Sequence, residues 1–467
     1  MTVSQSAAIV PSGLRSGENG HVFLSHSSRL KPKAATNQEV DELDEHDTWQ
    51  QHRHRKAFLA SLIPKLETKL FDRAFDVWVD KTFLSGGSST DTVIAEAIAK
   101  STVVVLLIDR DALRADYLTR EASIAMYRRT IEDDVRVIPV LLGGVSDDDL
   151  KASPLAKRSG VDVLLPFRPS SKKWNAKTAD DVAEQIAREV ADTTFNRTAR
   201  GDSLTRRWIE DVTYLLSEVP ELFLGRAADE LGIDRRVWLK HPNKPRVLAS
   251  QLFATTDLDA LHKAFREVFA YLRPDLSNLA LDRTLPLWVP HRAARTMASV
   301  NSMPADARVV GVSTSAYRLG RHIVKRATLC SSEYKCFRLP DVVGEAPAEE
   351  ALRRYEETIR EELGLSEGDG PDTVIDYFDN RYRGAYALVR TDAFDVATAD
   401  YITDTLHGLF PGLTIVMLNR RRMLGATISG LIHSLVELSD FEDLEARRFV
   451  SQTMALCDQS QPVDADD

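Results

Sequence analysis

The sequence predicts an α/β protein in which a parallel sheet precedes a small α-helical bundle and a mixed α/β region. Between residues 21 and 195, short apolar runs alternate with amphipathic helical patterns. This alternation is typical of a parallel sheet with helices on both faces. The strand pattern is lost from 203 to 276 and returns after 305. These three observations define the expected fold class.

A chain of 467 residues is too long for one hydrophobic core, so several domains are expected. The pattern changes predict a flexible leader at 1–20, a parallel α/β domain at 21–195 and a helical domain at 203–276. An α/β domain is expected at 305–457, followed by a solvated tail at 458–467.

Five strands are expected in the first domain, with helical patterns between them. The apolar runs that predict them are 21–25, 74–80, 102–109, 135–143 and 162–167. The third run, "TVVVLLID", is apolar almost throughout, which indicates a strand buried on both faces.

The second domain carries helical periodicity only. Within "LTRRWIEDVTYLLSEV", helical spacing places Trp208, Ile209, Val212, Leu215 and Leu216 on one face. A small bundle that buries such faces against one another is therefore expected.

The third domain is expected to contain strands and helices again. The runs "DTVIDYF" (372–378) and "GAYALVRT" (384–391) suggest a hairpin across the intervening "DNRYR". Further strands are expected at 308–315, 334–339 and 413–418, and helices at 346–363, 395–409 and 426–456.

Composition narrows the classes of function. A net charge of −10 argues against broad binding of nucleic acid or of anionic membranes. The most apolar run, 102–108, is far shorter than the roughly 20 residues that span a bilayer. The first 20 residues lack the pattern of a secretory signal. A cytoplasmic protein without membrane or nucleic-acid partners is therefore expected.

The chain contains three cysteines, Cys330, Cys336 and Cys457. So few cysteines, in an odd number, favour a reducing compartment over a disulfide framework. Cys330 and Cys336 are six residues apart with no second pair of ligands nearby, so no metal site is expected.

Motifs of the first domain resemble those of Toll/interleukin-1 receptor (TIR) domains. "HVFLSHSS" is similar to the first box of that family, and "VIPVLLG" to its fourth strand. "FDVWVDKTFLSGGSSTDTVIAEAIAKSTVVVLLI" resembles its second box and BB loop. The resemblance covers about 21–167 and implies a flavodoxin-like sheet of order 2-1-3-4-5. Ligands of such sheets lie beyond the carboxyl ends of the strands, where the connections change direction.

Some TIR domains cleave NAD at the nicotinamide–ribose bond, and the resemblance implies Glu121 as the catalytic residue. A helix here places Glu121 at the edge of an apolar stripe that contains Leu118 and Ala122. TIR enzymes carry tryptophan four residues before this glutamate, whereas this chain carries Tyr117. Tyr117 offers a smaller stacking surface at the same position.

The resemblance also implies which residues surround the substrate. Asp80, Phe83 and Gly86 would shape the rim of the pocket, while Ser25 and His26 would contact the nucleotide. A carboxylate that binds the ribose hydroxyls and offsets the charge developing on the sugar suffices for this cleavage. NAD+ is therefore expected as a substrate, with no cofactor and no metal.

An alternative interpretation is that these residues have structural roles only. In that case, Glu121 would be a solvated acid paired with Arg114 or Arg128. Asp80 would end its strand by bonding to turn backbone, and Gly86 would supply a positive φ.

The helical domain resembles the effector-associated, death-like adaptors of prokaryotic conflict systems. The residues that carry this resemblance are "AADELGIDRRVW", "NKPRVLASQLF" and "DLDALHKAFREVF". The resemblance implies docking to a copy of the same domain in a partner protein. A helical connector without a partner is the alternative.

The last domain is rich in basic residues. If the sheet gathers them, they would bind a phosphate-bearing signal, and otherwise they form a solvated face. The run "GVSTSAYRLG" lacks the P-loop spacing. The basic residues are Arg318, Arg321, Lys325, Arg326, Arg381, Arg383, Arg420, Arg421 and Arg422.

The resemblance to TIR enzymes implies an NAD+ glycohydrolase of prokaryotic antiphage defence. Homo-oligomers that stack through the TIR domain would activate it, because a site completed by a neighbour works only in an assembly. Three alternatives remain open. One is a scaffold without enzymatic activity, and another is an enzyme that releases a cyclic ADP-ribose. The third is nucleoside transfer or another hydrolysis on a different nucleotide.

Overall fold

A computed structural model gives the structure of the protein. The described residues are 20–26, 42–70, 75–79, 91–132, 135–171, 175–197, 203–314, 316–341, 348–366, 369–392, 394–419 and 432–459.

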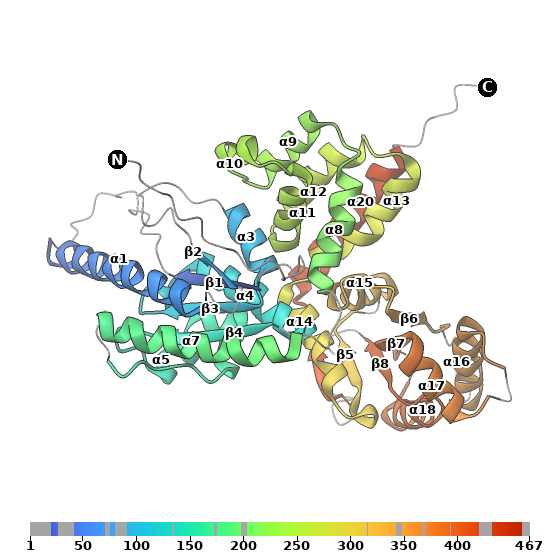
Figure 1. Ribbon diagram of the computed structural model, residues 1–467. Helices are drawn as coiled ribbons and strands as arrows, with labels where there is room; N and C mark the ends of the chain where they lie inside the picture. Colours follow the sequence, from blue (N-terminus) through green and yellow to red (C-terminus); the bar gives the residue numbers. More distant parts are fainter. Residues whose placement is uncertain are drawn as a thin grey trace, which may run out of the picture.

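The first sheet contains four parallel strands in the order β2-β1-β3-β4 (Figure 1). They are β1 (Gly20–His26), β2 (Phe75–Val79), β3 (Val103–Ile108) and β4 (Arg136–Leu141). Every residue of β3 is buried. Four of the five strands expected here are thus confirmed, including the fully buried third one.

The fifth expected strand, 162–167, is wrong. Its first part belongs to a short 3-10 helix, η3 (Val161–Val163), and only Phe167 forms a parallel bridge, to Val140 of β4. Pro166 precedes Phe167 and has no backbone N–H to donate to a ladder. The apolar run therefore touches the sheet edge at one residue.

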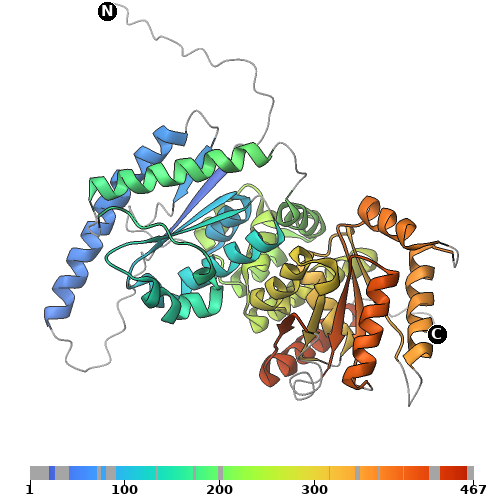
Figure 2. The same cartoon turned by 90° about the horizontal axis from the view of Figure 1, so that it is seen from below.

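Helices cover both faces of this sheet (Figure 2). The helices α1 (Glu42–Leu70) and α7 (Ala176–Arg197) pack on one face. The helices α3 (Asp91–Lys100) and α4 (Asp116–Ile131) pack on the other. Shorter elements join the strands: η2 (Ala112–Arg114), α5 (Asp147–Ala152) and α6 (Pro154–Ser159).

A layer of helices follows the first sheet. All five apolar residues expected on one face of its first helix are buried. The elements are α8 (Leu204–Leu216), α9 (Glu221–Glu230), α10 (Arg235–Lys240), α11 (Lys244–Ala254), α12 (Leu258–Phe269), α13 (Pro274–Thr284), η4 (Leu285–Trp288), α14 (His291–Ser299), η5 (Val300–Ser302) and η6 (Ala305–Ala307).

The second sheet has five parallel strands in the order β6-β7-β8-β5-β9. The strands are β5 (Val309–Val312), β6 (Tyr334–Arg338), β7 (Gly384–Arg390), β8 (Leu413–Leu418) and β9 (Ser434–Val436). The helices are α15 (Tyr317–Ala327), α16 (Ala348–Leu363), α17 (Pro371–Arg381), α18 (Val396–Leu409) and α20 (Asp440–Gln459).

The hairpin expected in this region is wrong. The run "DTVIDYF" lies in α17, and β7 pairs in parallel with β6 and β8. Pro371 begins α17, where its missing N–H costs nothing. Val374 and Tyr377 are three residues apart, so one helix face presents both to the core of the second sheet. Their strand propensity is thereby overridden by packing.

A buried ion pair joins the first sheet to the helical layer. Arg128 Nη2 lies 2.6 Å from Glu132 Oε2, and both side chains are 2% exposed. Glu132 Oε1 accepts hydrogen bonds from Ser203 Oγ at 2.8 Å and from the Thr205 backbone N–H at 2.7 Å. Glu132 at the end of α4 therefore also caps the start of α8.

A second buried cation, Arg326 of α15, joins all three parts of the chain. Its guanidinium lies over the rings of Tyr127 in α4 and Phe253 in α11, at 5.3 and 5.0 Å from their centroids. Arg326 Nη2 donates to the Phe253 carbonyl oxygen at 3.0 Å and lies 2.9 Å from His291 Nε2. Tyr127 OH in turn donates to the Arg326 carbonyl oxygen.

Replacement of Glu132 by alanine should destabilise the protein strongly. Burial alone would raise the pKa of Glu132, but Arg128 and the hydrogen bonds from Thr205 and Ser203 outweigh it and lower the pKa. Without this carboxylate, Arg128 is a buried, uncompensated charge, so the free energy of unfolding should fall by about 3–5 kcal/mol. Urea unfolding measures this. Ser203→Ala removes two hydrogen bonds, the one that Ser203 Oγ donates to Glu132 and the one that it accepts from the Arg206 backbone N–H, but leaves no buried charge unpaired. It should cost about 1–2 kcal/mol, and a loss equal to that of Glu132→Ala would contradict the ion-pair argument.

The stability should fall as the pH is lowered from 7.5 to 5.5. The pKa values of His291 and of His322 are lowered to about 3, chiefly because both rings are buried and further because cations lie nearby. Below pH 6.5 the unfolded chain binds protons at these histidines and the folded chain does not. Each therefore costs about 1.4 kcal/mol over this interval. Burial also lowers the pKa values of His262 and His407, which act in the same direction.

Urea unfolding at the two pH values checks this. His291→Gln should reduce the pH-dependent loss by about 1.4 kcal/mol. A free energy of unfolding that is equal at pH 7.5 and 5.5 would show that these histidines accept protons in the folded state.

Candidate functional site

Glu121 lies on the side of α4 that faces the first sheet and is 5% exposed. Ser25, at the carboxyl end of β1, donates its hydroxyl to Glu121 Oε2. The two residues are 96 positions apart in the sequence. The structure therefore holds this carboxylate away from bulk water, at the edge of the sheet where β1 ends.

Tyr117 lies one helical turn before Glu121 and is half-buried. Its hydroxyl donates to the carbonyl oxygen of His26, which is the last residue of β1. The structure thus brings together four residues that the sequence singled out: Ser25, His26, Tyr117 and Glu121.

A further acid at this edge was not among the expected site residues. Asp109 follows β3 directly and is 3% exposed. Its Oδ2 lies 2.6 Å from Nε of Arg55 in α1, and its Oδ1 accepts the Ala112 backbone N–H at 2.9 Å. The sequence signal that could have identified Asp109 as a site residue is its position as an acid directly after an apolar strand. Because α1 begins at Glu42, Arg55 lies in the middle of this helix, where it is buried.

A hollow beside Glu121 is small and partly closed by the helical layer. Ile94 and Ala95 of α3, Tyr117 and Glu121 of α4, and Ala254 of α11 line it. Its volume is about 20 Å³, which is room for about one water molecule. Pockets for nucleotide-sized ligands are on the order of 300–1,000 Å³. Among the described residues, this hollow is therefore much smaller than such a pocket.

The remaining expected residues, Asp80, Phe83 and Gly86, lie outside the described residues. Among the described residues, no group of three or more His, Cys, Asp and Glu side chains is placed to hold a metal ion. No helix within those same ranges has the length and apolar character needed to cross a membrane.

The order β2-β1-β3-β4 and the polar residues at the ends of β1 and β3 define a doubly wound α/β domain with its candidate site at the topological switch point. In agreement, residues 54–166 match the family of TIR domains. The chain therefore contains a TIR domain.

A curated relative matches part of the chain. It is the stimulator of interferon genes protein of Magallana gigas, which is 27% identical over 128 residues. The match covers 27% of this chain and 28% of that protein. The chain thus resembles little more than a quarter of its relative. No solved structure matches the chain.

Tyr117→Phe should destabilise the TIR domain modestly. The change leaves the carbonyl oxygen of His26 without this donor, so the free energy of unfolding should fall by about 1 kcal/mol. Denaturant unfolding measures the loss. Tyr214→Phe on α8, where the side chain is 65% exposed, is the matched control and should change stability by less than about 0.5 kcal/mol. Equal effects would show that the Tyr117 hydroxyl does not hold β1.

Proposed function

We propose that the TIR domain cleaves NAD+ at the bond between nicotinamide and ribose. The observation that supports this proposal is the buried carboxylate of Glu121, held by Ser25 at the carboxyl end of β1. Ligands of doubly wound sheets bind at this edge, next to the strand at which the connections reverse. A carboxylate at this place is suited to a substrate that becomes positively charged as it reacts.

In the proposed reaction, the C1′–N bond breaks and its electron pair leaves with nicotinamide, which becomes neutral. Positive charge then develops on the ribose, and the Glu121 carboxylate stabilises it. Water adds to C1′ and loses a proton, which gives ADP-ribose. Ser25 positions the carboxylate through its hydroxyl, and Tyr117 fixes the end of β1 through His26.

The closed hollow supports control of this activity by assembly. Ala254 of α11 lines the hollow beside Glu121, and we propose that α11 moves away from α3 when a dinucleotide binds. We propose that head-to-tail stacking of TIR domains in homo-oligomers drives this change. The resemblance of the helical layer to effector-associated adaptors supports a protein partner there, and a cytoplasmic role in prokaryotic antiphage defence.

One observation favours each of two alternatives. The small volume of the hollow, about 20 Å³, favours a scaffold that docks partners and cleaves nothing. The apolar residues Ile94, Ala95 and Ile124 around it would limit access of water, which favours attack by a group of the substrate itself and hence a cyclic ADP-ribose. Chromatography of the products separates the two enzymatic outcomes.

Glu121→Gln should abolish NAD+ cleavage. The amide keeps the size of the side chain but carries no charge to offset that of the ribose, so the rate should fall at least about 100-fold. Nicotinamide release from NAD+ is measured over a series of protein concentrations, because assembly should make the rate per molecule rise with concentration.

The matched control for this experiment is Asp116→Asn. Asp116 is the first residue of the same helix and its side chain is 92% exposed, so this change should leave the rate within about twofold. Absence of nicotinamide release at every concentration, or equal rates for Glu121→Gln and wild type, would support the scaffold.

A further inference from the structure

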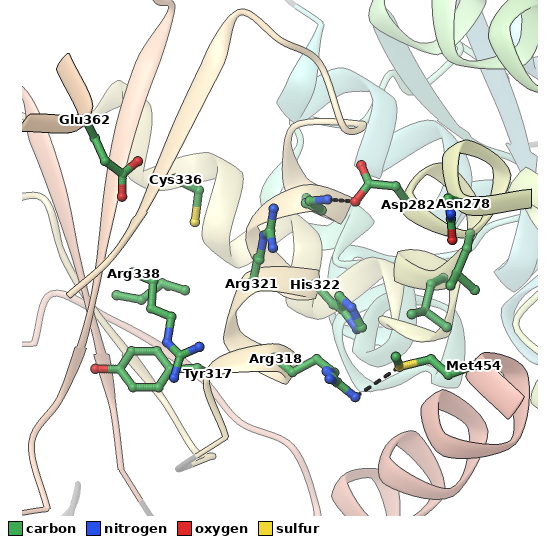
Figure 3. A pocket seen from close by; sticks show the side chains of 14 residues that line it. Asn278, Asp282, Tyr317, Arg318, Arg321, His322, Cys336, Arg338, Glu362 and Met454 are labelled. Carbon is green, nitrogen blue, oxygen red and sulfur yellow. Dashed lines mark hydrogen bonds and ion pairs between the residues drawn. The ribbon is translucent and has the colours of Figure 1, made fainter. Parts of the chain in front are cut away.

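A large cavity lies far from the TIR site, between the helical layer and the second sheet. Its volume is about 480 Å³, and residues of α13, α15, β6, β7 and α20 line it. Figure 3 shows side chains from these elements converging on one space. The volume is in the range of about 300–1,000 Å³ that binds small organic ligands.

Three arginines in this cavity have no carboxylate partner among the described residues. Arg318 and Arg321 come from α15, and Arg338 is the last residue of β6. Arg318 Nη1 contacts the Met454 sulfur at 3.0 Å, and the Arg338 guanidinium lies 4.9 Å from the ring centroid of Tyr317. Neither contact neutralises a charge, so both guanidinium groups keep their affinity for an anion.

The two acids in the cavity are already paired. Asp282 forms an ion pair with Lys325, and Glu362 lies 2.9 Å from Lys335 Nζ. The lining therefore has an excess of positive charge contributed by the three arginines. Arginine also presents a planar set of donors that matches the oxygens of a phosphate group.

Part of the cavity wall is apolar. Leu281, Leu285, Leu388 and Met454 line it. A ligand that fills the space thus needs an anionic part at the arginines and a less polar part against these side chains.

Some of the basic residues that the sequence analysis named line this cavity, and others lie elsewhere. Arg318, Arg321 and Lys325 line the cavity, together with Arg338, which was not expected. Arg326 lies on another side of α15 and contacts Tyr127 and Phe253 in the junction. Arg381 lies over Tyr377, Arg383 pairs with Glu333, and residues 420–422 lie outside the described ranges.

We propose that this cavity binds an organic phosphate of about nucleotide size. The phosphate groups would be bound by Arg318, Arg321 and Arg338, and the organic part would contact the apolar wall. Tyr317 and Arg338 are held in place before binding, because the Tyr317 hydroxyl donates to the Leu339 carbonyl oxygen at 2.6 Å and its ring supports Arg338. Such preorganisation reduces the entropy lost on binding.

The position of the arginines in the sheet supports the same proposal. Arg338 ends β6, and Arg318 lies in the first turn of α15, which follows the end of β5. The charged end of the cavity is therefore at the carboxyl edge of a parallel sheet, where ligands of open α/β sheets bind.

The chemistry of the lining indicates binding rather than catalysis. Burial raises the pKa of Cys336 to about 12, so its thiol stays protonated and is a weak nucleophile. Burial also lowers the pKa of His322 to about 3, and its Nδ1 accepts a hydrogen bond from Trp288 Nε1 at 2.9 Å. The neutral ring therefore carries its proton on Nε2 and is a donor, not a base, at that atom.

Calorimetric titration of the full chain with ADP tests this proposal. ADP should bind, and Arg321→Ala and Arg338→Ala should each weaken binding at least tenfold. Arg321→Lys, which keeps the charge, should restore part of the affinity. The matched control is Arg353→Ala in α16, an exposed arginine outside the cavity, which should bind ADP as the wild type does.

Two further probes separate the parts of the ligand. Adenosine should bind far more weakly than ADP, because it has no phosphate, and inorganic pyrophosphate should bind more weakly than ADP, because it does not contact the apolar wall. The proposal is overturned if ADP does not bind, or if the arginine variants bind it as tightly as Arg353→Ala. Equal binding of adenosine and ADP would overturn it as well. Unchanged circular dichroism and melting temperature of the variants exclude unfolding as a cause.

Discussion

The three parts of the chain meet at a buried guanidinium, that of Arg326. It is 2% exposed and has no carboxylate partner among the described residues; two aromatic rings, a backbone carbonyl and a neutral histidine surround it. Burial of a charge without a counter-charge costs free energy. Because the pKa of His291 is low, its ring is neutral and adds no second positive charge beside Arg326. If the parts separated, water would solvate Arg326, and this solvation would offset part of the free energy needed to expose the apolar side chains around it.

This junction also connects the TIR site with the cavity in the last domain. α15 carries Arg318 and Arg321 on the side of the cavity and Arg326 on the side of the junction. Arg326 contacts Phe253, and the next residue, Ala254, lines the hollow beside Glu121. Contacts between α15 and α11 thus link the elements that line the two proposed sites.

Much of the fold was predictable because local patterns and tertiary packing agree. The first four strands of the TIR sheet and the apolar face of α8 follow from short apolar runs and from helical spacing. The predictions failed where packing overrides propensity. Pro166 interrupts an apolar run that would otherwise be predicted as a strand. Val374 and Tyr377 have strand propensity but lie at helical spacing in α17, where both pack against the core of the second sheet.

The sequence alone determined the class of domain and drew attention to Glu121, because motif order and spacing are properties of the chain itself. Only the tertiary structure decided what that carboxylate contacts, since Ser25 lies 96 residues away and Ala254 belongs to another part of the chain. Likewise, the basic residues near 320 are visible in the sequence, but one side of α15 faces a cavity and the other a buried junction. Long-range packing distinguishes these two sides, and no local pattern encodes it.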